Sequence, residues 1–313
     1  MSNAPFLSIK NANIGYQQPL IEQVNAQIHQ GEVVLMIGAN GIGKTTLLKS
    51  LLKQIPFLNG QVYLNQNNLN KLDIKTLSKN IAVVWSKYQL PQHYTVRDLV
   101  ALGKYVHYPY YFSLKPADEA EVMRIIQNLG LEMYVQQKLN TLSDGNLQKA
   151  FIGRALAQNT PMIILDEPTT YLDENNKISI LKLLRNLAQK HHKTILFSSH
   201  DWRLAKEFSD QIWLIKEKKL YAGVVEDVLK AHAELTHFPT FHFSETFKAP
   251  NITAPDEERS LLLSLLRKNT AQDWSAYQFH YQNHHWQLHS SDGNWRNFKN
   301  FQEIKTFFNH LQK

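Results

Sequence analysis

The sequence has 313 residues, of which 43% are hydrophobic and 19% charged, so it has room for roughly two globular domains and is not a disordered chain. It contains no cysteine, which excludes a disulfide scaffold, a thiolate metal site and a cysteine nucleophile, and no apolar run approaches the ~18 residues of a membrane helix. The net charge of +7 lies wholly in residues 1–223 and is compatible with nucleic acid, anionic lipid or a phosphate ligand, whereas residues 224–313 are nearly neutral.

Short apolar segments alternate with helical patterns through the basic part of the chain. The apolar segments predict strands at residues 6–14, 33–37, 60–64, 81–85, 162–165, 194–198 and 211–216. The helical patterns fall at residues 45–53, 96–102, 118–130, 147–158 and 178–190. This alternation predicts an α/β domain over residues 1–223 with a mainly parallel sheet, interrupted by an inserted helical subdomain at about 88–160.

A glycine-rich loop lies between the apolar run at 33–37 and the helix that is expected to begin near Thr45. The loop matches the phosphate-loop pattern G-x-x-x-x-G-K-[ST] in full, with Gly38, Ala39, Asn40, Gly41, Ile42, Gly43, Lys44 and Thr45. Glycines let backbone N–H groups surround phosphate oxygens, Lys44 would reach the β- and γ-phosphates, and the Thr45 hydroxyl would bind Mg²⁺. The flanking strand and helix disfavour an ordinary glycine turn, so the motif predicts a nucleoside triphosphate site.

Two acidic residues end the apolar strand predicted at 162–165. Asp166 is placed to hold Mg²⁺ through its water shell, and Glu167 is placed to orient the attacking water as a general base. An apolar strand that ends in two acids is common on its own. Because it follows a phosphate loop, we interpret it as the second half of the same site.

Five motifs together resemble the ATP-binding subunits of ABC transporters over about residues 5–223. Besides the phosphate loop and the acidic pair, they are Leu142-Ser143-Asp144-Gly145-Asn146, Tyr171-Leu172-Asp173, and His200 after the strand predicted at 194–198. The resemblance implies a P-loop NTPase core with an antiparallel N-terminal β part, a helical subdomain and, here, a small C-terminal α+β extension. It also implies ATP and Mg²⁺ as cofactors and ATP hydrolysis as the activity.

The same resemblance implies a role for each motif. His200 would contact the γ-phosphate and act with Glu167 in catalysis, Thr46 would join the phosphate loop in binding ATP, and Tyr16 would stack on the adenine. The Ser143–Asn146 segment (Ser143, Asp144, Gly145 and Asn146) would contact the ATP held by a partner subunit, which implies a homodimer in the ATP-bound state. Asp173 would lie at the seam of that dimer.

A finer likeness narrows the family. The stretch from Thr95 to Tyr105 and the run from Asp166 to Asp173 look like those of importers for iron–siderophore, haem and cobalamin. This implies a subunit that powers metal-chelate import through a permease dimer, which receives its cargo from a periplasmic or surface substrate-binding protein. The expected location is peripheral, at the cytoplasmic face of the inner membrane. The cargo itself is not specified by this chain.

Two departures from the family pattern bear on activity. Ser86 occupies the place where most members carry a glutamine that touches Mg²⁺, with Gln89 and Gln92 downstream as possible substitutes, and Asp144 brings a negative charge toward a phosphate site. They leave open a regulatory ATP-binding module with little turnover. A soluble ABC ATPase acting on nucleic acid or ribosomes is a further alternative, although such proteins usually carry two cassettes or a long coiled-coil insert.

The segment 87–112 is rich in tyrosine and histidine. The family likeness makes it the groove that receives a coupling helix of the permease; an ordinary subdomain surface is the main alternative, and nucleic acid binding is disfavoured. Residues 224–313 fall outside the likeness.

This C-terminal extension is expected to hold helices at 224–235, 257–268 and 301–311, a linker at 250–256, and a hairpin that turns at Asn283-His284. Its tryptophans (Trp274, Trp286 and Trp295) are expected to form a small core. His285 and His289 are expected on one face of the hairpin and His280 and His284 on the other, which argues against a closed metal site.

Overall fold

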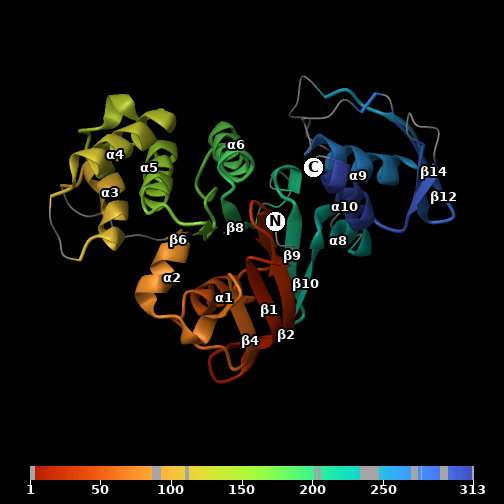
Figure 1. Ribbon diagram of the computed structural model, residues 1–313, viewed down its shortest axis with the longest axis horizontal. Coiled ribbons are helices and arrows are strands. Elements are labelled where there is room, and N and C mark those ends of the chain that lie inside the picture. Colours follow the sequence, from red (N-terminus) through yellow and green to blue (C-terminus); the bar gives the residue numbers. More distant parts are fainter. Residues whose placement is uncertain are drawn as a thin grey trace. The chain divides into compact units, whose positions relative to one another are not determined.

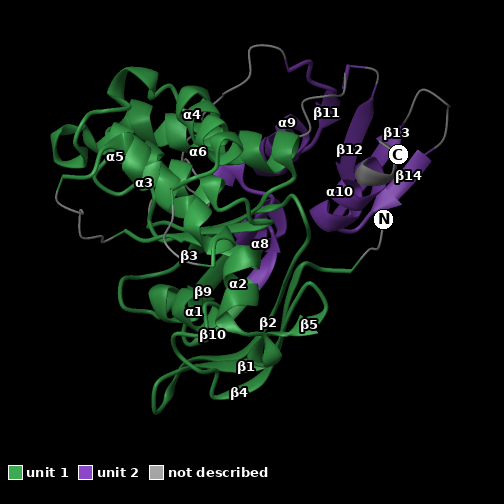
Figure 2. Cartoon of the chain, turned by 60° about the vertical axis from the view of Figure 1, so that its left-hand side comes forward, with its two compact units in different colours: residues 1–202, 213–221 green, residues 203–212, 222–313 purple. Residues whose placement is uncertain are grey.

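The computed structural model describes residues 4–86, 93–109, 113–200, 202, 206–232, 247–268, 274–275, 277–289 and 295–311. Contacts divide the chain into two compact units (Figure 2): unit 1 comprises residues 1–202 and 213–221, and unit 2 comprises residues 203–212 and 222–313. Within the described ranges, no helix is long and apolar enough to span a membrane.

Unit 1 begins with an antiparallel sheet of four strands in the order β2-β1-β4-β5. The strands are β1 (Leu7–Gly15), β2 (Pro19–Ile28), β4 (Asn59–Leu64) and β5 (Asn67–Asn68). The expected strand at 6–14 is confirmed within a residue. The apolar pattern does not predict β2, because its buried residues Ile21 and Val24 are three positions apart around Gln23 (φ 48°), which breaks the two-residue period at a register shift.

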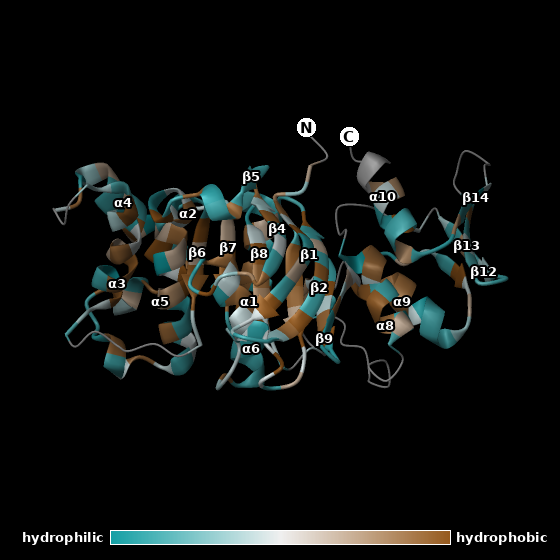
Figure 3. Ribbon diagram, turned by 90° about the horizontal axis from the view of Figure 1, so that it is seen from below, coloured by the Kyte–Doolittle hydropathy of each residue, from teal (hydrophilic) through white to brown (hydrophobic). Residues whose placement is uncertain are grey.

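The second sheet has the order β10-β9-β3-β8-β7-β6 and forms the centre of the ATPase-like fold. Its strands are β3 (Val33–Ile37), β6 (Ile81–Val84), β7 (Met162–Leu165), β8 (Thr194–Ser198), β9 (Gln211–Lys216) and β10 (Lys219–Val224). Strands β3, β8, β7 and β6 pair in parallel. Every side chain of β3, β7 and β8 is buried, as expected for parallel strands covered on both faces, and Figure 3 shows the hydrophobic colouring of this sheet. The predicted α/β class is confirmed.

Six helices of unit 1 accompany these sheets (Figure 1): α1 (Lys44–Leu51), α2 (Ile74–Asn80), α3 (Val96–Leu102), α4 (Pro116–Asn128), α5 (Asp144–Ala157) and α6 (Glu174–His191). Helices α3, α4 and α5 pack on one another as a helical group. A capping box between Thr95 and Asp98 begins α3. Where α3 ends, an added Cβ on Gly103 would lie 2.1 Å from the Arg154 carbonyl oxygen of α5, so this crossing requires glycine.

Unit 2 is a small α+β layer structure. Its sheet has the order β11-β12-β13-β14, and its helices are α8 (Val225–Ala231), α9 (Asp256–Arg267) and α10 (Phe301–Leu311). The strands are β11 (Asn251–Thr253), β12 (Gln278–Gln282), β13 (His285–His289) and β14 (Trp295–Phe298). An aromatic core fills it; the Trp274 and Phe308 rings meet edge to face with centroids 4.5 Å apart.

Residues 206–208 form a short 3₁₀ helix that packs within unit 2 although it lies between β8 and β9 in sequence. Phe208 is buried, and the Ser264 hydroxyl donates to the Glu207 carboxylate at 3.5 Å. Beside it, Lys268 Nζ lies 2.7 Å from Oε1 of the fully buried Glu226. The C-terminal unit therefore includes ten residues of the chain that the sequence pattern assigns to the ATPase part.

Three expectations for secondary structure and packing are wrong in detail. Helix α5 begins at Asp144 rather than at 147, because Ser143 caps it. The segment expected to be a linker contains β11, which pairs in parallel with β12. Trp274 and Trp286 are buried, but Trp295 is 57% exposed on the outer side of the sheet.

The faces of the C-terminal hairpin also differ from the expectation. The hairpin turns at Asn283 and His284, as predicted, but His280 pairs with Gln287 and therefore shares the face of His285 and His289. Phe279, Trp286 and Leu288 occupy the buried face. Trp295 covers both His280 and His289, with ring centroids 5.6 and 4.8 Å away. Among the described residues, no group of three or more His, Asp or Glu side chains is arranged to hold a metal ion.

Candidate functional site

The phosphate loop connects β3 to α1, so its backbone lies at the carboxyl end of a buried parallel strand. Gly43 precedes the helix in a left-handed conformation (φ 117°) that an L side chain rarely adopts. At the start of the loop, a Cβ on Gly38 would lie 2.8 Å from the Ile215 carbonyl oxygen of β9. Glycine is thus required at both positions, once for conformation and once for space. Helix α1 begins at Lys44, one residue before the predicted start.

The Lys44 ammonium is folded into this loop. Its Nζ donates to the carbonyl oxygens of Gly38 at 2.7 Å and Ala39 at 3.2 Å, and the residue is only 6% exposed. Burial lowers the pKa of Lys44, while the charges of Glu167 and Asp166 act in the opposite direction. The Lys44 ammonium is thus a buried positive charge inside a loop of backbone groups, which suits it to bind phosphate oxygens.

Asp166 directly follows β7, and hydroxyl groups from three other segments lie close to its carboxylate. Ser198 Oγ donates to its Oδ1 at 2.8 Å, and Thr45 Oγ1 lies 3.2 Å from its Oδ2. Ser86 Oγ lies 3.4 Å from the same Oδ2. Carboxylate and hydroxyl oxygens are the ligand types that Mg²⁺ prefers, so this set of donors fits the ion. Gln89 and Gln92, the possible substitutes for Ser86, lie outside the described residues.

Glu167 lies beside Asp166 with a left-handed backbone (φ 50°) that turns its side chain away from that of its neighbour. Its N–H donates to Ser198 Oγ at 2.9 Å, and its Oε2 accepts from Thr170 Oγ1 at 3.1 Å. The half-exposed His200 approaches the same oxygen, with Nδ1 3.7 Å away. The structure therefore places the two predicted catalytic residues side by side, with the His200 ring next to the Glu167 carboxylate.

The Ser143–Asn146 segment forms the first turn of α5. Ser143 Oγ accepts from the Asn146 N–H at 3.4 Å, Gly145 is buried, and Asp144 is exposed to solvent, at the end of the helix where its charge is favourable. A Cβ on Gly145 would lie 2.7 Å from Asn176 Oδ1. The segment is thus packed closely against the start of α6.

Asp173 caps α6 at that same place. Its Oδ1 accepts from the Asn176 N–H at 2.8 Å and its Oδ2 accepts from Asn176 Nδ2 at 2.7 Å. The hydrogen bonds from Asn176 lower the pKa of Asp173 and keep it ionised. Asn176 therefore lies against both Gly145 and Asp173, which are 28 positions apart in the chain and belong to two separate motifs.

The remaining predicted nucleotide residues lie in and near the elements that flank the loop. Tyr16 directly follows β1 and is 64% exposed, and Thr46 is half-buried in α1. Asn40, Gly41 and Ile42 form the turn between β3 and α1. Sequence analysis missed Ser198, Thr170 and Asn176. The available signal for Ser198 is a hydroxyl residue at the end of an otherwise apolar buried strand.

Comparison with known proteins agrees with this geometry. Residues 21–170 match the family model described as "ABC transporter". The achromobactin transport ATP-binding protein of Dickeya dadantii is 31% identical over 75% of this chain and 92% of its own length. The iron(3+)-hydroxamate import ATP-binding protein of Bacillus subtilis is 33% identical over 72% of this chain and 86% of its own.

Among solved structures, a dimeric post-hydrolysis state of an ATP-binding cassette bound to ADP and Pi is similar, with a TM-score of 0.61 and 27% identity over 70% of this chain and 98% of that one. The predicted family is confirmed by these matches. The chain belongs to the ABC transporter family, as an ATP-binding, ATP-hydrolysing subunit.

Proposed function

We propose that this chain powers the import of a metal chelate through a partner permease. The named roles of two relatives, in iron(3+)-hydroxamate import and achromobactin transport, support the class of cargo. The observation that carries the catalytic part is the network in which Ser198 joins the Asp166 carboxylate to the Glu167 backbone, beside Lys44 and His200. This network supports the proposal because it brings a metal-binding carboxylate close to a candidate general base.

In the proposed site, the phosphate loop binds the β- and γ-phosphates of ATP and Tyr16 stacks on the adenine. Thr45 and Asp166 would hold Mg²⁺, with Ser86 near enough to take the place of the usual glutamine; the ion would neutralise charge on the phosphates. Glu167 orients the attacking water and accepts its proton. Thr170 holds one oxygen of that carboxylate, and His200 contacts the γ-phosphate from the same side.

The active form is proposed to be a homodimer with two composite sites. The Ser143–Asn146 segment presents the N-terminal end of α5, with its free N–H groups, to the ATP of the partner subunit. Asp173 lies at the dimer seam. Because Asn176 touches both Asp173 and Gly145, any shift at the seam reaches the segment that contacts the partner's ATP.

A cavity of about 510 Å³ in the helical group supports docking of a permease coupling helix. It is lined in part by Tyr94, Arg97, Ala101, Leu102 and Tyr105, which belong to the aromatic segment noted in the sequence. Aromatic, arginine and small apolar side chains are typical of the centre of a protein interface. Residues 87–92 and 110–112 of that segment lie outside the described residues.

The location and further partners complete the proposal. The subunit attaches peripherally to the cytoplasmic face of the inner membrane through its permease dimer, which takes cargo from a periplasmic or surface substrate-binding protein. Residues 1–223 serve as the ATPase domain, with a helical subdomain at about 88–160, and residues 224–313 form the C-terminal extension.

The test uses the complex of this chain with its permease in proteoliposomes. Glu167→Gln removes the proposed base, whereas Glu174→Gln changes an exposed acid in the first turn of α6 and serves as the matched control. We expect wild type and the control to hydrolyse ATP and accumulate ferric hydroxamate, and Glu167→Gln to do neither while still binding ATP. Wild-type turnover no faster than that of Glu167→Gln would contradict the catalytic assignment, and turnover without chelate uptake would contradict the cargo class.

A further inference from the structure

A second cavity of unit 1 lies far from the phosphate site, between α4, α5 and α6. Its volume is about 380 Å³, which is within the range of small-molecule sites. Asn159 and Lys193, which line it, precede β7 and β8, whereas Asp166 and Ser198 lie at the carboxyl ends of those strands. The cavity is therefore at the opposite edge of the parallel sheet from the nucleotide.

Basic side chains surround this cavity. Arg124 comes from α4, Lys190 and His191 from the last turn of α6, and Lys193 from the residues that follow it. The one carboxylate in the lining belongs to Glu121, which is already ion-paired with Lys104. The lining thus carries an excess of positive charge.

The basic side chains of this cavity differ in whether they already have a hydrogen-bond or ion-pair partner within the protein. Lys193 Nζ donates to the Thr160 carbonyl oxygen at 2.7 Å and to Asn159 Oδ1 at 3.3 Å, so it neutralises the carbonyl-rich end of α5. Neither Arg124 nor Lys190 has a carboxylate partner among the described residues. These two cations therefore remain available to a ligand.

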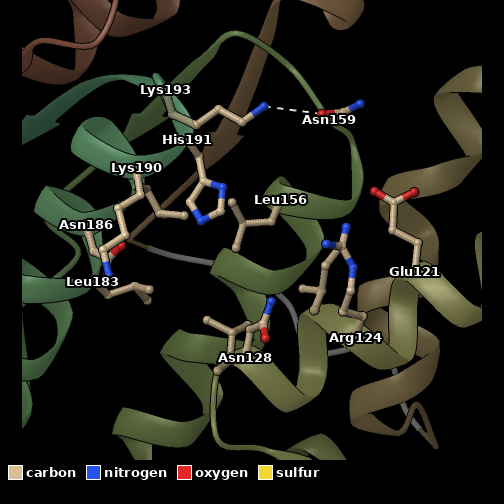
Figure 4. A pocket seen from close by; sticks show the side chains of 13 residues that line it. Glu121, Arg124, Asn128, Leu156, Asn159, Leu183, Asn186, Lys190, His191 and Lys193 are labelled. Atoms are coloured by element: carbon tan, nitrogen blue, oxygen red, sulfur yellow. Dashed lines mark hydrogen bonds between the residues drawn. The ribbon is translucent and has the colours of Figure 1, made fainter.

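The rest of the lining is apolar or an uncharged amide. Leu156 and Leu183 lie in the wall, and Asn128 and Asn186 add hydrogen-bonding groups. In Figure 4, the side chains of His191 and Arg124 lie on either side of Leu156. Cationic groups thus border an apolar surface within one cavity.

We infer that this cavity binds an organic anion in which a phosphate group is attached to a small apolar body. Arg124 and Lys190 would hold the phosphate by charge-assisted hydrogen bonds, and the leucines would cover the apolar body. Inorganic phosphate lacks that body and a neutral aromatic lacks the charge, so neither uses the whole site. Because α6 runs from this cavity to Asp173, occupancy acts on the same rigid helix that Asp173 caps.

The test is calorimetric titration of the full chain, saturated with MgADP to fill the nucleotide site, with phenyl phosphate as the probe. Arg124→Gln and Lys190→Gln each remove one cation, and Lys182→Gln removes an exposed lysine of α6 that does not line the cavity. We expect one binding site per chain, weakened about tenfold or more in either cavity variant, the size expected for one charge-assisted hydrogen bond, and unchanged in the control.

Three results would overturn the inference. They are no saturable binding of phenyl phosphate, an equal loss in Lys182→Gln, and binding of inorganic phosphate as tight as that of phenyl phosphate. All three substituted residues are exposed, so each variant is expected to fold, and its melting temperature is measured alongside.

Discussion

Ser198 is the residue whose replacement tests the candidate site most directly. Its hydroxyl donates to Asp166 Oδ1 at 2.8 Å and accepts from the Glu167 N–H at 2.9 Å, so one atom fixes both acidic residues. Ser198→Ala removes that atom from a fully buried position and changes nothing else in the side chain. A hydrogen bond to a charged group contributes about 1.5–3 kcal/mol, and a buried N–H without a partner costs about 1–3 kcal/mol.

If the contribution of the hydrogen bond to the charged group is lost in the transition state, kcat decreases about 10- to 150-fold. ATP affinity is expected to stay near that of wild type, because Ser198 has no role in the phosphate loop. The assay measures steady-state ATP hydrolysis and, separately, binding of a fluorescent ATP analogue. Ser50→Ala is the matched control: Ser50 is also buried, but its hydroxyl has no hydrogen-bond partner within the described part of the chain, so its loss is expected to leave kcat unchanged. A folded Ser198→Ala protein with kcat within twofold of wild type would refute the reasoning.

Three further predictions concern packing and buried charge. Gly145→Ala places a Cβ 2.7 Å from Asn176 Oδ1, so either the Asn176 side chain leaves its position beside Asp173 or the start of α5 shifts; we expect ATPase activity to fall while ATP binding persists, and unchanged turnover would contradict this. Lys268→Met leaves the fully buried Glu226 without its partner and should destabilise unit 2 by about 3–5 kcal/mol in denaturant unfolding, whereas adding Glu226→Leu should restore most of that loss. Burial raises the pKa of Glu207, so its contribution to stability is complete below the ordinary glutamate pKa and is lost as the pH rises through the higher folded value. Glu207→Gln should therefore raise the melting temperature at pH 8 and lose that advantage near pH 4; an equal shift at both pH values would contradict the assignment.

Features encoded within a few consecutive residues could be predicted from the sequence. The bounds predicted for β3, β7 and β8 agree with the structure because a strand covered on both faces is a nearly continuous apolar run. The phosphate loop could be recognised because its glycine positions follow from local backbone conformation and close packing. The acidic pair followed from its position at the end of a buried strand.

Features that depend on partners distant in sequence could not be predicted in this way. Ser198 meets Asp166 only because β8 lies beside β7, and Asn176 lies against Gly145 only because α5 and α6 begin side by side. The face of His280 depends on the register of β12 against β13, and the hairpin turn alone does not fix the side to which a residue points. The helical start at Asp144 was missed because Ser143 and Asp144 continue a polar run, which hides a cap that only backbone geometry reveals.

The ten residues 203–212 have a consequence for the order in which this protein is made. They are synthesised before any of residues 222–313, yet the unit to which they belong is completed only by those later residues. Until synthesis ends, which takes about 5 to 20 s at ordinary rates, Phe208 and Glu207 have nowhere to be buried while the flanking strands β8 and β9 are already available to pair. The nascent chain therefore contains Phe208, an apolar side chain that is buried in the finished fold, before the C-terminal unit to which it belongs is complete. A stop codon after residue 223 would leave that unit permanently incomplete.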